Sequence, residues 1–149
     1  LSIGYPTPED EDEILKRRAE RKNDIVDLQA IISPETFMKM RAAVEGVYLD
    51  PDVRRYMVDL AAKTRNHQQI VVGVSPRGSL ALLKLTRAWA AIHGCEYVVP
   101  DDVKQFVQSS LAHRIILDPS LWDVKRSENH MIEEVVQTVP VPVLNPEDE

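Results

Sequence analysis

The sequence predicts an all-α protein, a compact helical bundle, and three observations support this class. Its 149 residues are 44% hydrophobic and 28% charged, which is ordinary for a folded globular domain. Only two Phe, two Trp and four Tyr are present, fewer aromatics than a sheet-rich fold would normally use. Prolines that follow Ser or Asp open three amphipathic segments, a pattern typical of helix starts.

The N-terminal part predicts one helix behind a short extended segment. The acidic run Glu9–Glu13 precedes a basic cluster at 16–18, and this order suits the helix macrodipole. A helix near 9–21 is therefore expected. The apolar stretch at 1–5 ends at Pro6, like the last strand of an upstream domain.

Three middle helices are expected where a capping side chain precedes a proline: Ser33-Pro34, Asp50-Pro51 and Ser75-Pro76. The first should end at Gly46. The second carries an apolar stripe at helical spacing, made of Val53, Tyr56, Met57, Leu60 and Ala61. The third should run to about His93 and end at Gly94, and its apolar residues on nearly all sides predict the central helix.

Two further helices complete the predicted bundle. One follows the Val99-Pro100 step, and its inward side should comprise Val103, Phe106, Val107 and Leu111. The other is expected near Glu128–Thr138, before an acidic, Pro-rich tail. Short extended segments are predicted at 70–74 and 97–99.

Charge and composition narrow the function classes. The net charge is −6 and the pI about 5.2, which opposes general nucleic-acid binding. The single cysteine, Cys95, excludes an internal disulfide and indicates a reducing compartment. No apolar run is long enough for a membrane span, so membrane insertion is not expected. The chain begins at Leu1, so we expect a piece of a longer, cytoplasmic protein.

The sequence lacks the motifs of a complete nucleotide-hydrolysing site. None of its five glycines is followed by Lys, so there is no Gly-Lys-Ser/Thr phosphate loop. No apolar strand ends in Asp-Glu to hold magnesium. Metal-ligand spacing is also missing among His67, His93, Cys95, His113 and His130. The chain is therefore not expected to be an enzyme by itself, and no metal site is predicted.

Arg77 is the most informative residue, because it follows the predicted cap Ser75 and Pro76 at a helix start. Free backbone N–H groups and the positive end of the helix dipole favour an anion there. A guanidinium could hold phosphate oxygens through two parallel hydrogen bonds. Lys84 and Arg87 follow along the helix, and from the residues alone the better interpretation is that all three form the solvated edge of a buried helix.

An ordered set of short motifs resembles one family, the C-terminal region of the MoxR-type AAA+ ATPases, which are related to magnesium-chelatase ATPase subunits. The motifs are Tyr5-Pro6, Ile14-Leu15, Tyr56, Thr64-Arg65, Gly73–Arg77, Leu80, Ala88, Ala90, Gly94, Tyr97–Val103 and Leu111–Arg114. Each motif alone is weak, but the ordered set is specific. The resemblance spans about Leu1 to Arg114 and extends loosely to the Val139–Pro142 tail.

The resemblance implies residue roles. In the family a helical lid packs beside an αβα nucleotide-binding core, and the arginine matching Arg77 is the sensor-2 residue that reaches the ATP γ-phosphate. Tyr5 and Pro6 match the hinge near the adenine, and the resemblance also places Ile14 on the adenine side. ATP and Mg would bind the full-length protein, and neither is expected to bind this fragment alone.

The same resemblance sets domain boundaries and one structural role. Residues 1–8 would be the end of the core and the hinge, 9–125 the helical lid, and 126–149 the C-terminal helix and tail. Arg114 of the His113-Arg114 motif is interpreted as a rim residue held by ion pairing. Gly78 and Cys95 stand where the family pattern suggests Ala and Arg, and these departures are expected to be minor.

The expected partners are the protein's own AAA+ core and further copies in a homo-oligomeric ring, commonly a hexamer. Such chaperone-like rings remodel or assemble other proteins, often ones with von Willebrand factor A domains. Two alternatives remain from the residues themselves. One is a helix-turn-helix DNA binder that reads with 50–65 and exposes Arg54 and Arg55, and the other is a free-standing adaptor without nucleotide.

Overall fold

The computed structural model describes residues 4–21, 28–120 and 127–143. Two compact units divide the chain, Leu1–Pro34 and Glu35–Glu149. The boundary predicted at 125/126, residues 1–3 of the predicted extended segment and the end of the acidic tail lie outside the described residues. The predicted domain limits stay predictions.

Helix α1 (Pro8–Arg21) forms the regular part of the N-terminal unit, within one residue of the predicted start. The Thr7 hydroxyl accepts a hydrogen bond from the Asp10 N–H at 3.2 Å and so caps the helix. Acids fill its first turn and bases its last, as the macrodipole favours. Gly4 and Tyr5 belong to no strand.

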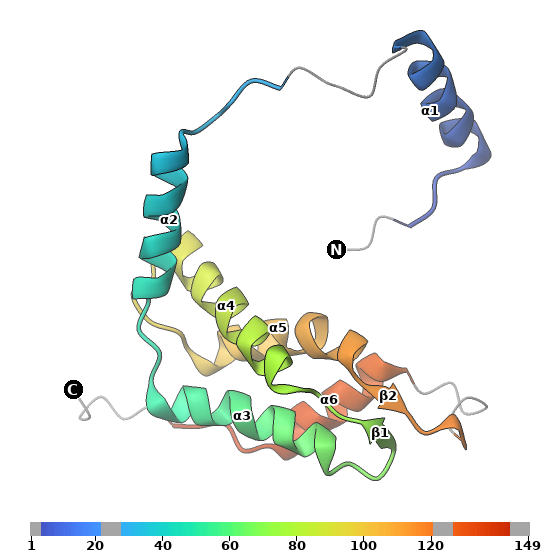
Figure 1. Ribbon diagram of the computed structural model, residues 1–149. Coiled ribbons are helices and arrows are strands. Elements are labelled where there is room, and N and C mark those ends of the chain that lie inside the picture. Colours follow the sequence, from blue (N-terminus) through green and yellow to red (C-terminus); the bar gives the residue numbers. More distant parts are fainter. Residues whose placement is uncertain (1–3, 22–27, 121–126, 144–149) are drawn as a thin grey trace. The chain divides into compact units, whose positions relative to one another are not determined.

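The second unit contains the remaining helices and a very small sheet (Figure 1), so the predicted all-α bundle is confirmed. Its elements are α2 (Pro34–Gly46), α3 (Pro51–Arg65), β1 (Ile70–Val72), α4 (Pro76–Ile92), α5 (Pro100–Leu111), the 3₁₀ turn η1 (Ala112–Arg114), β2 (Ile116–Leu117) and α6 (Glu128–Thr138). Each predicted helix is present, and Gly94 follows α4 with a φ of 70°. Within the described ranges, no helix has the length and apolar character needed to cross a membrane.

The core lies where α3, α4, α5 and α6 pack on one another. The whole predicted stripe of α3 is buried. Helix α4 packs mainly on α5 and buries only the side formed by Gly78, Leu82, Thr86 and Ala90. Its prediction as a central helix is wrong, because Leu80, Leu85 and Ile92 are exposed.

One buried polar group stands out in this core. The Tyr56 hydroxyl is buried and meets no hydrogen-bond partner among the described residues. Burial raises the pKa of Tyr56 above its ordinary value of 10.0, and the opposing Lys104 and Asp101 charges contribute less. Tyr56 therefore acts in the core as a neutral apolar ring.

The extended segments are shorter than predicted. Strand β1 ends at Val72 and pairs antiparallel with β2, through Ile70–Leu117 and Val72–Ile116. The stretch predicted at 97–99 forms no named strand and contributes one isolated parallel bridge between Tyr48 and Tyr97. This bridge still fixes the α2–α3 connection against the α4–α5 connection.

Helix α2 differs from α3, α4, α5 and α6, because none of its residues is buried. Phe37 and Met40, which helical spacing places on one face, are both more than half exposed. The predicted helix is therefore present, and it leaves these apolar side chains exposed.

Candidate functional site

Arg77 occupies the second position of α4 and is exposed to solvent. The first turn of this helix contains no acidic residue. Among the described residues, the Arg77 side chain takes part in no hydrogen bond or ion pair. Its guanidinium, beside the positive end of the helix dipole, is thus available to an anion.

The chain just before α4 is held by two side chains at the end of α3. The Val74 N–H donates to the Thr64 hydroxyl at 2.9 Å, and Arg65 Nε donates to the Val74 carbonyl oxygen at 2.7 Å. Thr64 and Val74 are both fully buried. Both polar groups of Val74 are therefore bound by adjacent residues three positions before Arg77.

Two glycines allow the chain to pack closely at this point. A Cβ on Gly73 would lie 2.6 Å from the Cα of Arg65, and a Cβ on Gly78 would lie 2.3 Å from Val74 Cγ1. Neither contact is sterically possible without movement of the neighbour. Gly78 was expected to be a minor departure, but its missing side chain is what lets Val74 pack beneath the first turn.

Arg114 also contacts the first turn of α4, from η1. Its Cδ lies 3.4 Å from the position of a Cβ on Gly78, and its Nε donates to the Ser110 carbonyl oxygen at 2.9 Å. The predicted ion pairing of Arg114 is wrong: within the described part of the chain its partner is a backbone carbonyl. Arg65, Arg77 and Arg114 thus surround one helix start, and none has a carboxylate partner among the described residues.

The later basic residues of α4 behave differently from Arg77. Arg87 Nη1 lies 3.2 Å from Glu45 Oε2, and this ion pair links α4 to α2. Lys84 is exposed. The predicted solvated edge of three basic residues is therefore wrong for Arg87.

The other residues implied by the resemblance lie elsewhere. Tyr5, Pro6 and Ile14 belong to the N-terminal unit and are exposed. Their roles near an adenine stay predictions. His113 is exposed on η1. Arg55, proposed as a DNA contact, lies 3.3 Å from Asp59 on its own helix.

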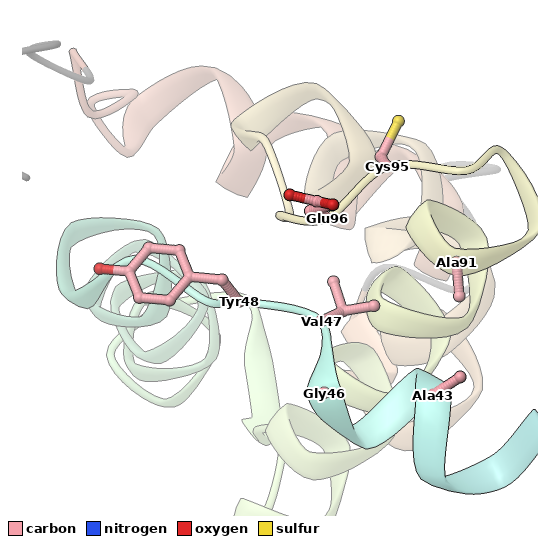
Figure 2. A pocket seen from close by; sticks show the side chains of 7 residues that line it. All are labelled: Ala43, Gly46, Val47, Tyr48, Ala91, Cys95 and Glu96. Carbon is pink, nitrogen blue, oxygen red and sulfur yellow. The ribbon is translucent and has the colours of Figure 1, made fainter. Parts of the chain in front are cut away.

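A separate open pocket of about 550 Å³ lies between the end of α2 and the α4–α5 connection (Figure 2). It is lined by Ala43, Gly46, Val47, Tyr48, Ala91, Cys95 and Glu96. Figure 2 shows the Tyr48 ring extending away from Ala43 and Gly46. The lining contains an acid and no base, so it does not suit a phosphate. Across the described residues, no three His, Cys, Asp or Glu side chains are grouped to hold a metal.

Sequence reasoning found Arg77 but assigned no role to Thr64 and Arg65. A signal for Thr64 was present, because it continues the buried stripe of α3 after Leu60 and Ala61. A buried threonine at the end of such a stripe needs a hydrogen-bond partner. Its partner, the Val74 N–H, is ten residues further along the chain.

Comparisons with known proteins point to one family. The family model described as the AAA lid domain matches residues 62–138. The uncharacterized protein YeaC of Bacillus subtilis is 34% identical over 143 residues, which cover 96% of this chain and 44% of YeaC. The chaperone MoxR1 of Mycobacterium tuberculosis is 28% identical over 156 residues, which cover 97% of this chain and 40% of MoxR1.

A solved structure has the same fold. The crystal structure of a "putative ATPase" from Cytophaga hutchinsonii superposes with a TM-score of 0.74 at 25% identity, covering 95% of this chain and 45% of that one. The chain thus spans less than half the length of these relatives.

Proposed function

Because the chain belongs to the AAA lid domain family and is the lid region of a MoxR-type AAA+ ATPase, we propose that Arg77 is its sensor-2 residue. In this proposal the ATP and its Mg ion bind a core domain joined to this region. Arg77 extends from the lid to the γ-phosphate. Tyr5, Pro6 and Ile14 serve the hinge on the adenine side.

One observation carries the proposal: Arg77 is an exposed arginine at a helix start, without an ionic partner among the described residues. A cation beside a helix N-terminus is unfavourable by about 0.3–1 kcal/mol. A bound anion would reverse that cost, because the helix start and the guanidinium would then attract the same group. A triphosphate supplies such a group.

The proposed mechanism couples phosphate chemistry to movement of the lid. The γ-phosphate attracts Arg77 and so favours a closed arrangement of lid and core. Charge develops on the phosphoryl oxygens during transfer, and the guanidinium stabilises it. Hydrolysis and loss of phosphate remove that attraction, and the lid is released.

We further propose that the whole protein works as a homo-oligomeric ring, commonly a hexamer, in the cytoplasm. Lid movement would then remodel or help assemble partner proteins, including ones with von Willebrand factor A domains. Support for this chaperone-like role comes from the similarity to MoxR1, which is named a chaperone.

The test is the replacement Arg77→Ala in the full-length protein, followed by ATP turnover. Loss of one charge-stabilising group costs about 2–4 kcal/mol, so we expect kcat to fall about 30-fold or more. The matched control is Arg54→Ala, which removes an exposed arginine near the start of α3. Circular dichroism should show both variants folded. Equal turnover in the two variants would refute the sensor-2 role.

A further inference from the structure

We propose that Thr64 and Arg65 are positioning residues for Arg77, an inference that rests on the proposed sensor-2 role. They touch no nucleotide in this proposal. Their function is to fix the peptide groups of Val74, and through these the direction in which α4 and Arg77 point.

The Thr64 hydroxyl makes two hydrogen bonds. It donates to the Ala61 carbonyl oxygen at 2.7 Å and accepts from the Val74 N–H at 2.9 Å. The hydroxyl is thus oriented by its own helix before it receives the second chain. Because Thr64 and Val74 are fully buried, water cannot replace either bond without local opening.

Arg65 contacts the same segment, residues 73 and 74. Its Nε donates to the Val74 carbonyl oxygen at 2.7 Å. A Cβ on Gly73 would lie 2.6 Å from the Arg65 Cα and 2.8 Å from its Cγ, so the glycine lies directly against the arginine. Arg65 therefore limits both translation and rotation of the chain that leads into α4.

The connection from Val74 to Arg77 is short and stiff. Pro76 fixes its own φ angle and restricts Ser75 to extended backbone, where ψ is 165°. The Gly78 N–H then donates to the Ser75 carbonyl oxygen at 2.8 Å. A shift at Val74 is thus passed to Arg77 rather than absorbed between them.

The contacts of Thr64 and Arg65 with Val74 would place the Arg77 guanidinium accurately. A misplacement of about 1 Å can reduce turnover about 100-fold. Thr64→Val removes both hydrogen bonds with little change of volume, so we expect kcat for ATP to fall at least about tenfold. Thr64→Ser keeps the hydroxyl and should restore most of the turnover.

The experiment is a double-mutant cycle in the full-length protein, with kcat measured for Thr64→Val, Arg77→Ala and their combination. If Thr64 acts through Arg77, Thr64→Val has little further effect in the Arg77→Ala background. The matched control is Thr86→Val, because Thr86 is also fully buried but its hydroxyl bonds only to carbonyls of its own helix. Thr86→Val should leave kcat unchanged.

The outcomes separate this inference from the function on which it rests. Normal turnover in Arg77→Ala refutes the sensor-2 role and the inference with it. Loss in Arg77→Ala with normal turnover in Thr64→Val refutes the inference alone. An equal loss from Thr64→Val in both backgrounds, or no rescue by Thr64→Ser, shows a general structural role and also refutes it.

A second variant covers the case in which Thr64→Val does not fold. Arg65→Met keeps the aliphatic contact with Gly73 and removes the donor to the Val74 carbonyl oxygen. Arg65 is exposed, so this change perturbs the core less. We expect the same loss of kcat and the same coupling to Arg77→Ala, and additive effects would refute the inference.

Discussion

At the start of α4, Arg77 is exposed and has no ionic partner among the described residues, whereas Arg87, about three turns along the same helix, pairs with Glu45 of α2 at 3.2 Å. The two residues have the same side chain and share one helix. Only Arg77 is free to meet an external anion. The difference lies in what surrounds each residue.

The helix itself distinguishes the two positions electrostatically. The positive end of the dipole lies beside Arg77, so that arginine gains nothing from its own helix. Arg87 lies before the last turn of α4, where the dipole has little effect, and its carboxylate partner comes from a different helix. An arginine at the unfavourable end needs an explanation outside the described contacts.

The packing around the two ends of α4 also distinguishes the two arginines. The N-terminal end is held by Thr64 and Arg65, and its Gly78 lies against Val74. Near the other end the partner helix, α2, has no buried residue. The end that carries Arg77 is therefore held by specific contacts with another part of the chain, as expected of a group that must be positioned.

The largest loss of stability is expected where the packing at Gly78 is disturbed. In Gly78→Ala the new methyl group would lie 2.3 Å from Val74 Cγ1, in a fully buried place. We expect the free energy of unfolding to fall by about 1–3 kcal/mol, measured by urea denaturation, even though alanine favours the helix.

A matched control exists in α2. A Cβ on Gly46 would meet nothing within 4 Å, so Gly46→Ala should leave stability unchanged or raise it slightly. Val74→Ala should offset part of the cost of Gly78→Ala in the double variant, because it removes the clashing methyl. Equal stability of Gly78→Ala and Gly46→Ala would contradict the tight packing.

The sequence predicted the helices well because their limits depend on local signals. Proline at the first position marks α2, α3 and α4, and Gly94 marks the end of α4. Burial is different, since apolarity shows what a side chain favours and not whether a partner is present. Leu80, Leu85 and the α2 side chains are exposed for that reason.

The candidate site was likewise predictable from the sequence only where it depends on neighbouring residues. The place of Arg77 follows from Ser75 and Pro76, which are adjacent to it. The contacts that distinguish Arg77 from Arg87 join residues far apart in sequence: Arg87 and Glu45 are 42 positions apart. The two-residue strand β2 was missed for a related reason, because it is defined only by its pairing with β1.

A smaller effect should separate the two arginines directly. Arg87→Met removes the ion pair with Glu45, whose carboxylate is largely exposed, so we expect a loss of at most about 1 kcal/mol in the free energy of unfolding. High salt should reduce this loss, because it screens the pair. Arg77→Met should be neutral or stabilising by about 0.3–1 kcal/mol, since it removes a cation from a helix start.

Urea denaturation at low and high salt measures both variants. A double-mutant cycle with Glu45→Ala isolates the pair and should show coupling for Arg87→Met but none for Arg77→Met. A destabilising Arg77→Met would mean that Arg77 has an internal partner. The contrast between the two ends of α4 would then fail.

The smallest expected effect concerns Ser75, which sequence patterns marked as a capping side chain. Ser75 does occupy the N-cap position of α4, but its side chain makes no capping hydrogen bond, whereas Asp50 accepts from the Asp52 N–H of α3 at 2.7 Å. We therefore expect Ser75→Ala to cost only a few tenths of a kcal/mol, and Asp50→Ala about 1 kcal/mol. Thermal unfolding of the two variants measures the difference. Equal losses would show that the Ser75 hydroxyl, and not the contacts of Val74, holds the start of α4.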